Sequence, residues 1–96
     1  MYIVLLKFAD HKSKAPQLME KHTEWIKQGF MDGVFLLTGS LQPQLGGVII
    51  ANSESRDELI KRILKDPFVA EGVVIPEVLE IKPGQAVHNL EFLIEK

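Results

Sequence analysis

The chain has 96 residues; 46% are hydrophobic and 25% charged, and 11 basic against 13 acidic residues give a formal net charge of −2. This length suits a single domain spanning residues 1–96, and the composition excludes an intrinsically disordered chain. Without a basic excess the chain has little to neutralise phosphates, so we expect no nucleic acid partner. The absence of cysteine excludes disulfide bonds and thiolate chemistry, and it fits a cytoplasmic protein.

The apolar segments of the chain are short. None approaches the ~20 residues that a membrane-spanning helix needs, so we expect no membrane association. The N-terminal segment lacks the basic flank and the small-residue cleavage site of a signal peptide. Residues 2–8 instead form an apolar run with β-branched and aromatic side chains, which predicts a buried strand.

The next segments show first a helical and then a strand pattern. Apolar residues at helical spacing predict a helix over residues 15–28, which Gly29 is expected to end. Residues 34–38 and 45–51 are predicted to be strands, and their closeness in sequence favours a hairpin. The second of these strands carries neither stacking aromatic residues nor basic flanks, which argues against an RNA-recognition domain.

The second half of the chain predicts one more helix and one or two strands. A capping-box pattern at residues 55–58 predicts a helix start, and Pro67 cannot continue that helix. Residues 73–82 predict a strand, in which Pro76 indicates an edge position or a bulge. Apolar and polar residues alternate over 87–95, which predicts a C-terminal extension strand or a partner-binding tail.

The resulting element order, β-α-β-β-α-β, predicts an α+β domain of the ferredoxin-like class with an antiparallel sheet. Its core would span residues 2–82, and residues 83–96 would form a C-terminal extension. Both helices are expected on one face of the sheet, which leaves the other face bare. An apolar face of that size usually meets a partner, so we predict a homodimer through the open sheet face.

Two residues suggest acid–base chemistry. His22 falls in the middle of the apolar stripe of the first helix, where an imidazole needs a partner for its ring nitrogens. Asp66 falls at the end of the second predicted helix, beside Pro67 and Phe68. Each has an ordinary explanation: a core histidine bonded to a backbone carbonyl, and a turn in which the carboxylate accepts from nearby amides. If the fold brings the two together, they would form a general base or acid.

Other candidate residues could complete a ligand site. Gly39 allows a ligand to approach the backbone, and Ser40 offers a hydroxyl, although both also suit a bulge before the hairpin. Trp25 and Phe68 could wall a pocket or simply belong to the core. No metal site is predicted, because the three histidines lack metal-ligand spacing.

The motifs resemble those of the YCII-related family. The chain is similar to it across roughly residues 2–82, through the segments at 22–26, 33–41, 47–50 and 66–73. The resemblance implies a dimeric ferredoxin-like α+β barrel similar to muconolactone isomerase, with His22 and Asp66 as the catalytic pair. The family often has Gly-Pro where this chain has Gly39 and Ser40.

The function that the resemblance implies is a lyase or isomerase that needs no cofactor. It would act on a small cyclic or aromatic metabolite by proton transfer between the substrate and the His–Asp pair, as in dehydrohalogenation. A non-catalytic domain that binds a small molecule, a purely structural dimer domain and, as a minor alternative, metal-dependent hydrolysis all remain open. The sequence alone therefore leaves enzymatic activity undecided.

Overall fold

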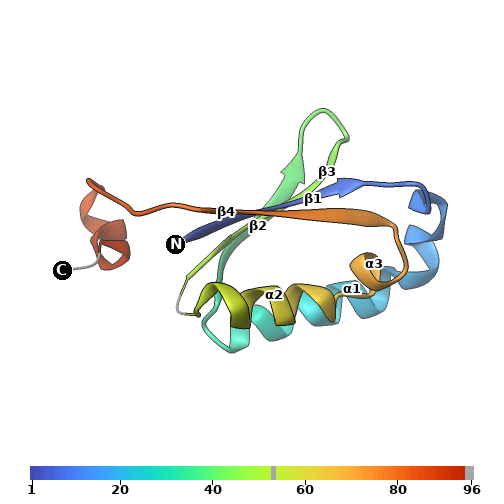
Figure 1. The fold of residues 1–96 in the computed structure, drawn as a ribbon, viewed down its shortest axis with the longest axis horizontal. Coiled ribbons are helices and arrows are strands. Elements are labelled where there is room, and N and C mark those ends of the chain that lie inside the picture. Colours follow the sequence, from blue (N-terminus) through green and yellow to red (C-terminus); the bar gives the residue numbers. More distant parts are fainter. Residues whose placement is uncertain (53, 95–96) are drawn as a thin grey trace.

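A computed structural model of the chain describes residues 1–52 and 54–94, and the fold is α+β (Figure 1). None of the helices in these residues is long and apolar enough to cross a membrane. The elements in chain order are β1 (Tyr2–Phe8), the 3₁₀ helix η1 (Lys12–Lys14), α1 (Ala15–Met31), β2 (Phe35–Leu41), β3 (Gly46–Ala51), α2 (Arg56–Leu64), α3 (Pro67–Ala70), β4 (Val74–Glu80) and the 3₁₀ helix η2 (His88–Leu93).

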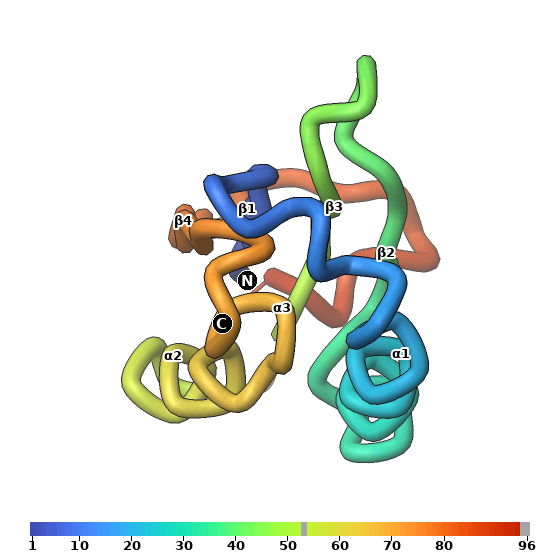
Figure 2. Tube along the Cα trace, turned by 90° about the vertical axis from the view of Figure 1, so that its right-hand side faces the viewer, coloured from blue at the N-terminus to red at the C-terminus, as the bar shows by residue number. Residues whose placement is uncertain are grey.

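The four strands form one antiparallel sheet in the order β2-β3-β1-β4. The helices α1, α2 and α3 all lie on one side of it, and α1 and α2 run side by side (Figures 1 and 2). The order places each β-α-β crossover around a central strand, which confirms the ferredoxin-like prediction.

The core lies between the sheet and the helices. The most deeply buried apolar side chains come from both layers, Val4 and Ile49 from the sheet and Leu59 and Ile63 from α2, and each is at most 1% exposed. Removing such a side chain from water contributes about 1.5–3 kcal/mol, so burial of the helix faces accounts for their position on the sheet.

The first helix continues past Gly29, where the sequence predicted its end. It ends at Met31, and Gly33, with φ +74°, makes the turn that follows. Gly29 is buried because α1 there passes close to Phe35: a Cβ added at Gly29 would lie 2.2 Å from the Phe35 ring. The glycine therefore serves close packing between a helix and a strand.

The second helical segment is divided into two helices. Ser55 caps α2, because its side-chain oxygen accepts a hydrogen bond from the Glu58 backbone N–H at 3.2 Å, which confirms the predicted cap. The chain then leaves helical geometry at Asp66 and starts the short helix α3 at Pro67, as expected of a proline at a first helical position. Asp66 therefore caps the start of a helix, whereas the sequence placed it at a helix end.

The four strands predicted within residues 2–82 are all present and differ only in their bounds. β2 runs to Leu41, so Gly39 and Ser40 lie inside the strand and not after it. Pro76 lies within β4, which is an edge strand as the proline indicated. A proline is tolerated there because an edge strand has one side without ladder partners.

The prediction of a C-terminal extension strand is wrong for the described residues. Residues 88–93 form η2 beyond the sheet, and residues 83–94 extend away from the body of the domain (Figure 1). A strand needs a neighbour to satisfy its backbone, whereas a 3₁₀ helix satisfies it locally. Here the N–H groups of Leu90 and Ile94 donate to the carbonyls of Val87 and Glu91 at 2.9 and 3.0 Å. Residues 95 and 96 of the predicted strand lie outside the described residues.

We predict that Gly29→Ala destabilises the protein. The added methyl must displace the buried Phe35 ring, and overpacking of this kind costs about 1–3 kcal/mol. Urea unfolding measures the change. Gly84→Ala is the control, because nothing lies within 4 Å of a Cβ at that position. A Gly29→Ala protein as stable as the wild type would contradict the packing role, and recovery in Gly29→Ala/Phe35→Leu would support it.

Candidate active site

The fold brings His22 and Asp66 into direct contact. His22 lies on the face of α1 that turns toward the sheet, and Asp66 lies in the break between α2 and α3. The distance between His22 Nδ1 and Asp66 Oδ1 is 2.7 Å, and the two side chains are 12% and 0% exposed. The partner of the imidazole is therefore a buried carboxylate and not a backbone carbonyl.

The hydrogen bonds of Asp66 define which ring nitrogen carries the proton. An ionised carboxylate only accepts hydrogen bonds, so Nδ1 of His22 is the donor and Nε2 is the nitrogen with a free lone pair. Nε2 has no hydrogen-bond partner in the described part of the chain. Neutral His22 thus presents a base, and the carboxylate would stabilise the imidazolium after proton uptake.

Asp66 also has the backbone role that its position in a turn suggested. Its Oδ1 accepts from the Phe68 N–H at 3.0 Å as well as from His22. Its Oδ2 is buried without a hydrogen-bond partner among residues 1–52 and 54–94. A buried carboxylate loses its hydration, so these two bonds offset part of that cost and fix the carboxylate in place.

Two aromatic rings, those of Phe68 and Trp25, stack with the His22 imidazole. The Phe68 ring stacks on His22 with a centroid distance of 3.9 Å and an interplanar angle of 2°. The Trp25 ring lies 6.0 Å from His22 at 25°. Stacking and the Asp66 bond together restrict both rotation and tilt of the ring.

A cavity of about 210 Å³ opens beside His22, between the helices and one end of the sheet, where β1, β2, β3 and β4 all contribute lining residues. Its apolar walls are Leu6, Phe8, Met19, Phe68 and Val74. Its remaining lining residues are His22, Gly39, Ser40, Gly46 and Gly47. The structure therefore places five of the six predicted site residues in one site: four line the cavity, and Asp66 lies behind His22.

Trp25, the sixth predicted residue, lies outside the lining of this cavity. Its indole N–H donates to the Arg62 carbonyl at 3.0 Å, which ties α1 to α2. Arg62 in turn donates to Asp32 at 2.9 Å and to Glu54 at 3.0 and 3.2 Å. Trp25 therefore packs beside His22 and fixes α1, the helix that carries His22, to α2.

Hydrogen bonds and charges in the cluster of Arg62, Asp32 and Glu54 shift two pKa values. The Gln28 side-chain hydrogen bond and then the Arg62 guanidinium lower the pKa of Asp32 below its ordinary value of 3.8. Hydrogen bonding to Glu54 raises the pKa of Arg62, which stays charged.

Sequence reasoning missed the part of the cavity contributed by Gly46, Gly47, Met19 and the strand residues around them. The strand register supplies the missing signal, because Gly47 pairs with Leu6 on one side and with Ser40 on the other. Paired residues in a sheet point to the same face, so a hydroxyl and a missing side chain are adjacent there.

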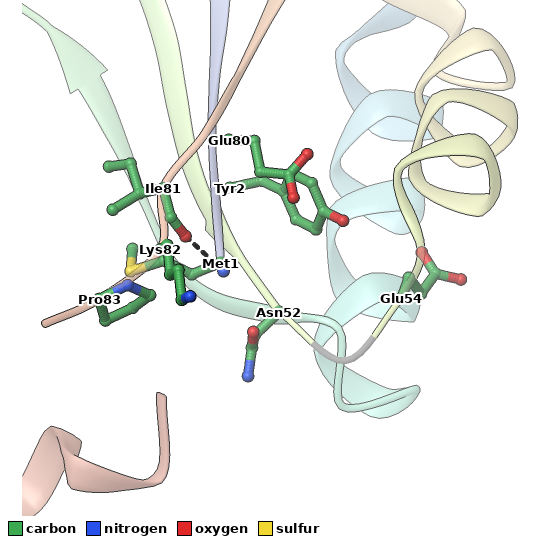
Figure 3. Close-up of a pocket in the computed structure, with 8 residues that line it drawn as sticks. All are labelled: Met1, Tyr2, Asn52, Glu54, Glu80, Ile81, Lys82 and Pro83. Atoms are coloured by element: carbon green, nitrogen blue, oxygen red, sulfur yellow. Dashed lines mark hydrogen bonds between the residues drawn. The ribbon is translucent and has the colours of Figure 1, made fainter. Parts of the chain in front are cut away.

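A second cavity, of about 430 Å³, lies at the other end of β1 (Figure 3). The N-terminal ammonium of Met1 donates to the Ile81 carbonyl there at 3.0 Å, and Glu80 and Lys82 also line the space. It is larger than the His22 cavity. Within the described ranges 1–52 and 54–94, no three His, Asp or Glu side chains gather as metal ligands would.

Comparison with known proteins identifies the family. The model of the YCII-related domain matches residues 1–83, so the chain belongs to the YCII-related family. Among curated proteins, no sequence matches this chain significantly.

One solved structure with a similar fold is the 5-chloro-2-hydroxyhydroquinone dehydrochlorinase (TftG) from Burkholderia phenoliruptrix AC1100, in complex with 2,5-dihydroxybenzoquinone. The TM-score is 0.69 and the sequence identity 17%, over 88% of this chain and 96% of that one. At this identity the likeness shows the fold.

We predict that the hydrogen bonds of Asp32, first with Gln28 and then with Arg62, make part of the stability depend on pH. A carboxyl whose folded pKa is lowered contributes stability above its unfolded pKa, near 3.8, and loses it as the pH falls through the folded value. Asp32→Asn should therefore reduce stability at pH 7 more than at pH 3. Thermal melts of both proteins between pH 7 and pH 3 measure this difference, and an equal loss at both ends would contradict it.

Proposed function

We propose that this protein is a lyase or isomerase that acts on a small cyclic or aromatic compound by proton transfer at His22. The observation that carries the proposal is the 2.7 Å bond between His22 and the buried Asp66, which leaves Nε2 without a partner among the described residues, beside a small, mostly apolar cavity. A core histidine with a structural role alone does not need a free nitrogen at a cavity.

In an elimination, Nε2 of His22 removes a proton from the substrate. The electron pair of that bond forms a new double bond, and the leaving group departs with its own bonding pair. In an isomerisation, the imidazolium returns the proton to a different carbon. Asp66 keeps Nε2 as the basic nitrogen and stabilises the imidazolium, and Ser40 donates to a substrate oxygen that gains charge.

The ligand of the structural neighbour supports the choice of substrate class. That dehydrochlorinase binds 2,5-dihydroxybenzoquinone, a single oxygenated ring. The cavity here has the size for such a ring, because a cavity of about 150 Å³ in another protein holds benzene. None of the steps above requires a cofactor, since proton transfer and departure of a halide need only the base and the hydroxyl.

We predict that His22→Gln lowers the rate of chloride release from chlorinated hydroquinones by about 10²–10⁴-fold, the usual contribution of a general base. Asp66→Asn should lower it less, because an amide oxygen still accepts from Nδ1 without its charge. Chloride release and circular dichroism are measured together. His88→Gln is the matched control, because His88 is exposed in the C-terminal segment, where its Nδ1 lies 3.7 Å from Oε2 of Glu91.

Equal rates in His22→Gln and the wild type would contradict the proposal. Binding of the hydroquinones without turnover in the wild type would identify a binding domain instead.

We also propose that the open face of the sheet packs against a second copy of the chain. Residues that alternate with the buried positions of each strand point to this face. They are mainly apolar: Ile3, Leu5, Leu37, Val48, Ile50, Ile75 and Leu79. Ile75 and Leu37 are 65% and 55% exposed, and none of the helices in the described residues covers this side (Figure 1). Lys7 and Glu77 lie on the same face, and their opposite charges form an ion pair at 3.6 Å.

An identical open face is a complementary partner for this surface, because both present the same flat apolar sheet. We predict that Ile75→Lys converts a dimer into a folded monomer, since it places an additional charge on the apolar face that would be buried between the two copies. Leu64→Lys is the control: Leu64 is 59% exposed but lies on the helix side. Light scattering during gel filtration measures the mass. A monomeric wild type, or equal dissociation by both variants, would contradict the proposed interface.

A further inference from the structure

Of the two adjacent glycines at the start of β3, the backbone conformation requires one and not the other. Gly46 has φ +136°, and a Cβ there would lie 2.0 Å from the Leu6 carbonyl oxygen, so the backbone requires glycine. Gly47 has no positive φ, and a Cβ there would meet only the Gly39 carbonyl oxygen at 3.6 Å, an ordinary contact. The fold therefore accepts a side chain at position 47.

A glycine in a strand costs stability, because it has more freedom to lose on folding than any other residue. The backbone does not require glycine at position 47, and glycine there lowers stability. We therefore expect that the ligand site needs the space that a side chain would fill.

The empty space at Gly47 is the floor of the His22 cavity. Gly47 pairs with Leu6 and with Ser40, and all three line the cavity together with His22. Since paired residues share a face, a side chain at position 47 would enter the cavity between those of Leu6 and Ser40. It would occupy the place next to the only hydroxyl among the lining residues of this cavity.

We propose that Gly47 sets the size limit of the substrate, so that the site admits one flat ring with an oxygen substituent and rejects fused two-ring compounds. The inference rests on the proposed function, because it assigns a substrate class to the same cavity. The ring would lie over Gly47, with its oxygen at Ser40 and its edge toward Nε2 of His22. The cavity of about 210 Å³ is of the same order as the cavity of about 150 Å³ that holds benzene in another protein.

The test uses binding, so that it does not depend on turnover. Phenol is the one-ring probe and 2-naphthol the two-ring probe, and both are titrated into ¹⁵N-labelled protein while the amide resonances of Ser40, Gly47 and Phe68 are followed. The proteins are the wild type, Gly47→Ala, Gly47→Val and the control Gly84→Ala. Melting temperatures are measured for all four proteins.

We expect phenol, and not 2-naphthol, to shift these resonances in the wild type. Gly47→Ala should weaken phenol binding at least about tenfold, the usual effect of one added carbon in a tight pocket, and Gly47→Val should abolish it. Gly84→Ala should bind as the wild type does. The melting temperature of Gly47→Ala should be equal to or above that of the wild type, a result that a purely structural glycine would not give.

Three results would overturn the size limit: 2-naphthol binds the wild type as tightly as phenol, Gly47→Val retains phenol, or phenol shifts none of these resonances in the wild type. A drop in the melting temperature of Gly47→Ala would overturn it as well. If phenol binds as expected but the wild type releases no chloride from chlorinated hydroquinones, the size limit is supported and the proposed lyase activity is contradicted.

Discussion

The hydrogen bond between His22 and Asp66 is the constraint around which the site is arranged. Asp66 is fully buried, and a carboxylate without water around it needs donors. Its two donors, the His22 ring and the Phe68 N–H, come from α1 and from the start of α3. The residue that completes the helix cap therefore also determines which nitrogen of the imidazole faces the cavity.

The sequence predicted the parts of the site that depend on periodicity. Helical spacing placed His22 on the inward face of α1, and the order of elements placed both helices on the same side of the sheet. Those two facts bring the end of α2 close to His22. The break at Pro67 was also visible, but its consequence was not: Asp66 begins a new helix, and one oxygen serves both the cap and the imidazole. A local pattern indicates a turn, but not a second acceptor role that depends on a contact 44 residues away.

The features that sequence reasoning missed depend on packing between segments. The local pattern indicates a helix end at Gly29, yet Gly29 lies inside α1, where the Phe35 ring leaves no room for a Cβ. The strand pattern ends at Thr38, yet β2 continues through Gly39 and Ser40. Residues 87–95 alternate like a strand, but residues 88–93 form η2, where backbone hydrogen bonds are local. In each case a long-range contact, or the lack of one, decided between conformations that the local sequence allows.

The double role of Asp66 links ligand binding to the stability of one small part of the fold. α3 has four residues, so its own helical hydrogen bonds are few, and its cap and the Phe68 stack on His22 contribute much of its order. Any local opening that releases α3 removes the cap, the stack and the orientation of the imidazole in a single event. A compound that binds only the oriented His22 must therefore shift this opening equilibrium toward the closed state. Slower hydrogen exchange at the Phe68 amide is thus the natural signature of an occupied site, whatever the compound turns out to be.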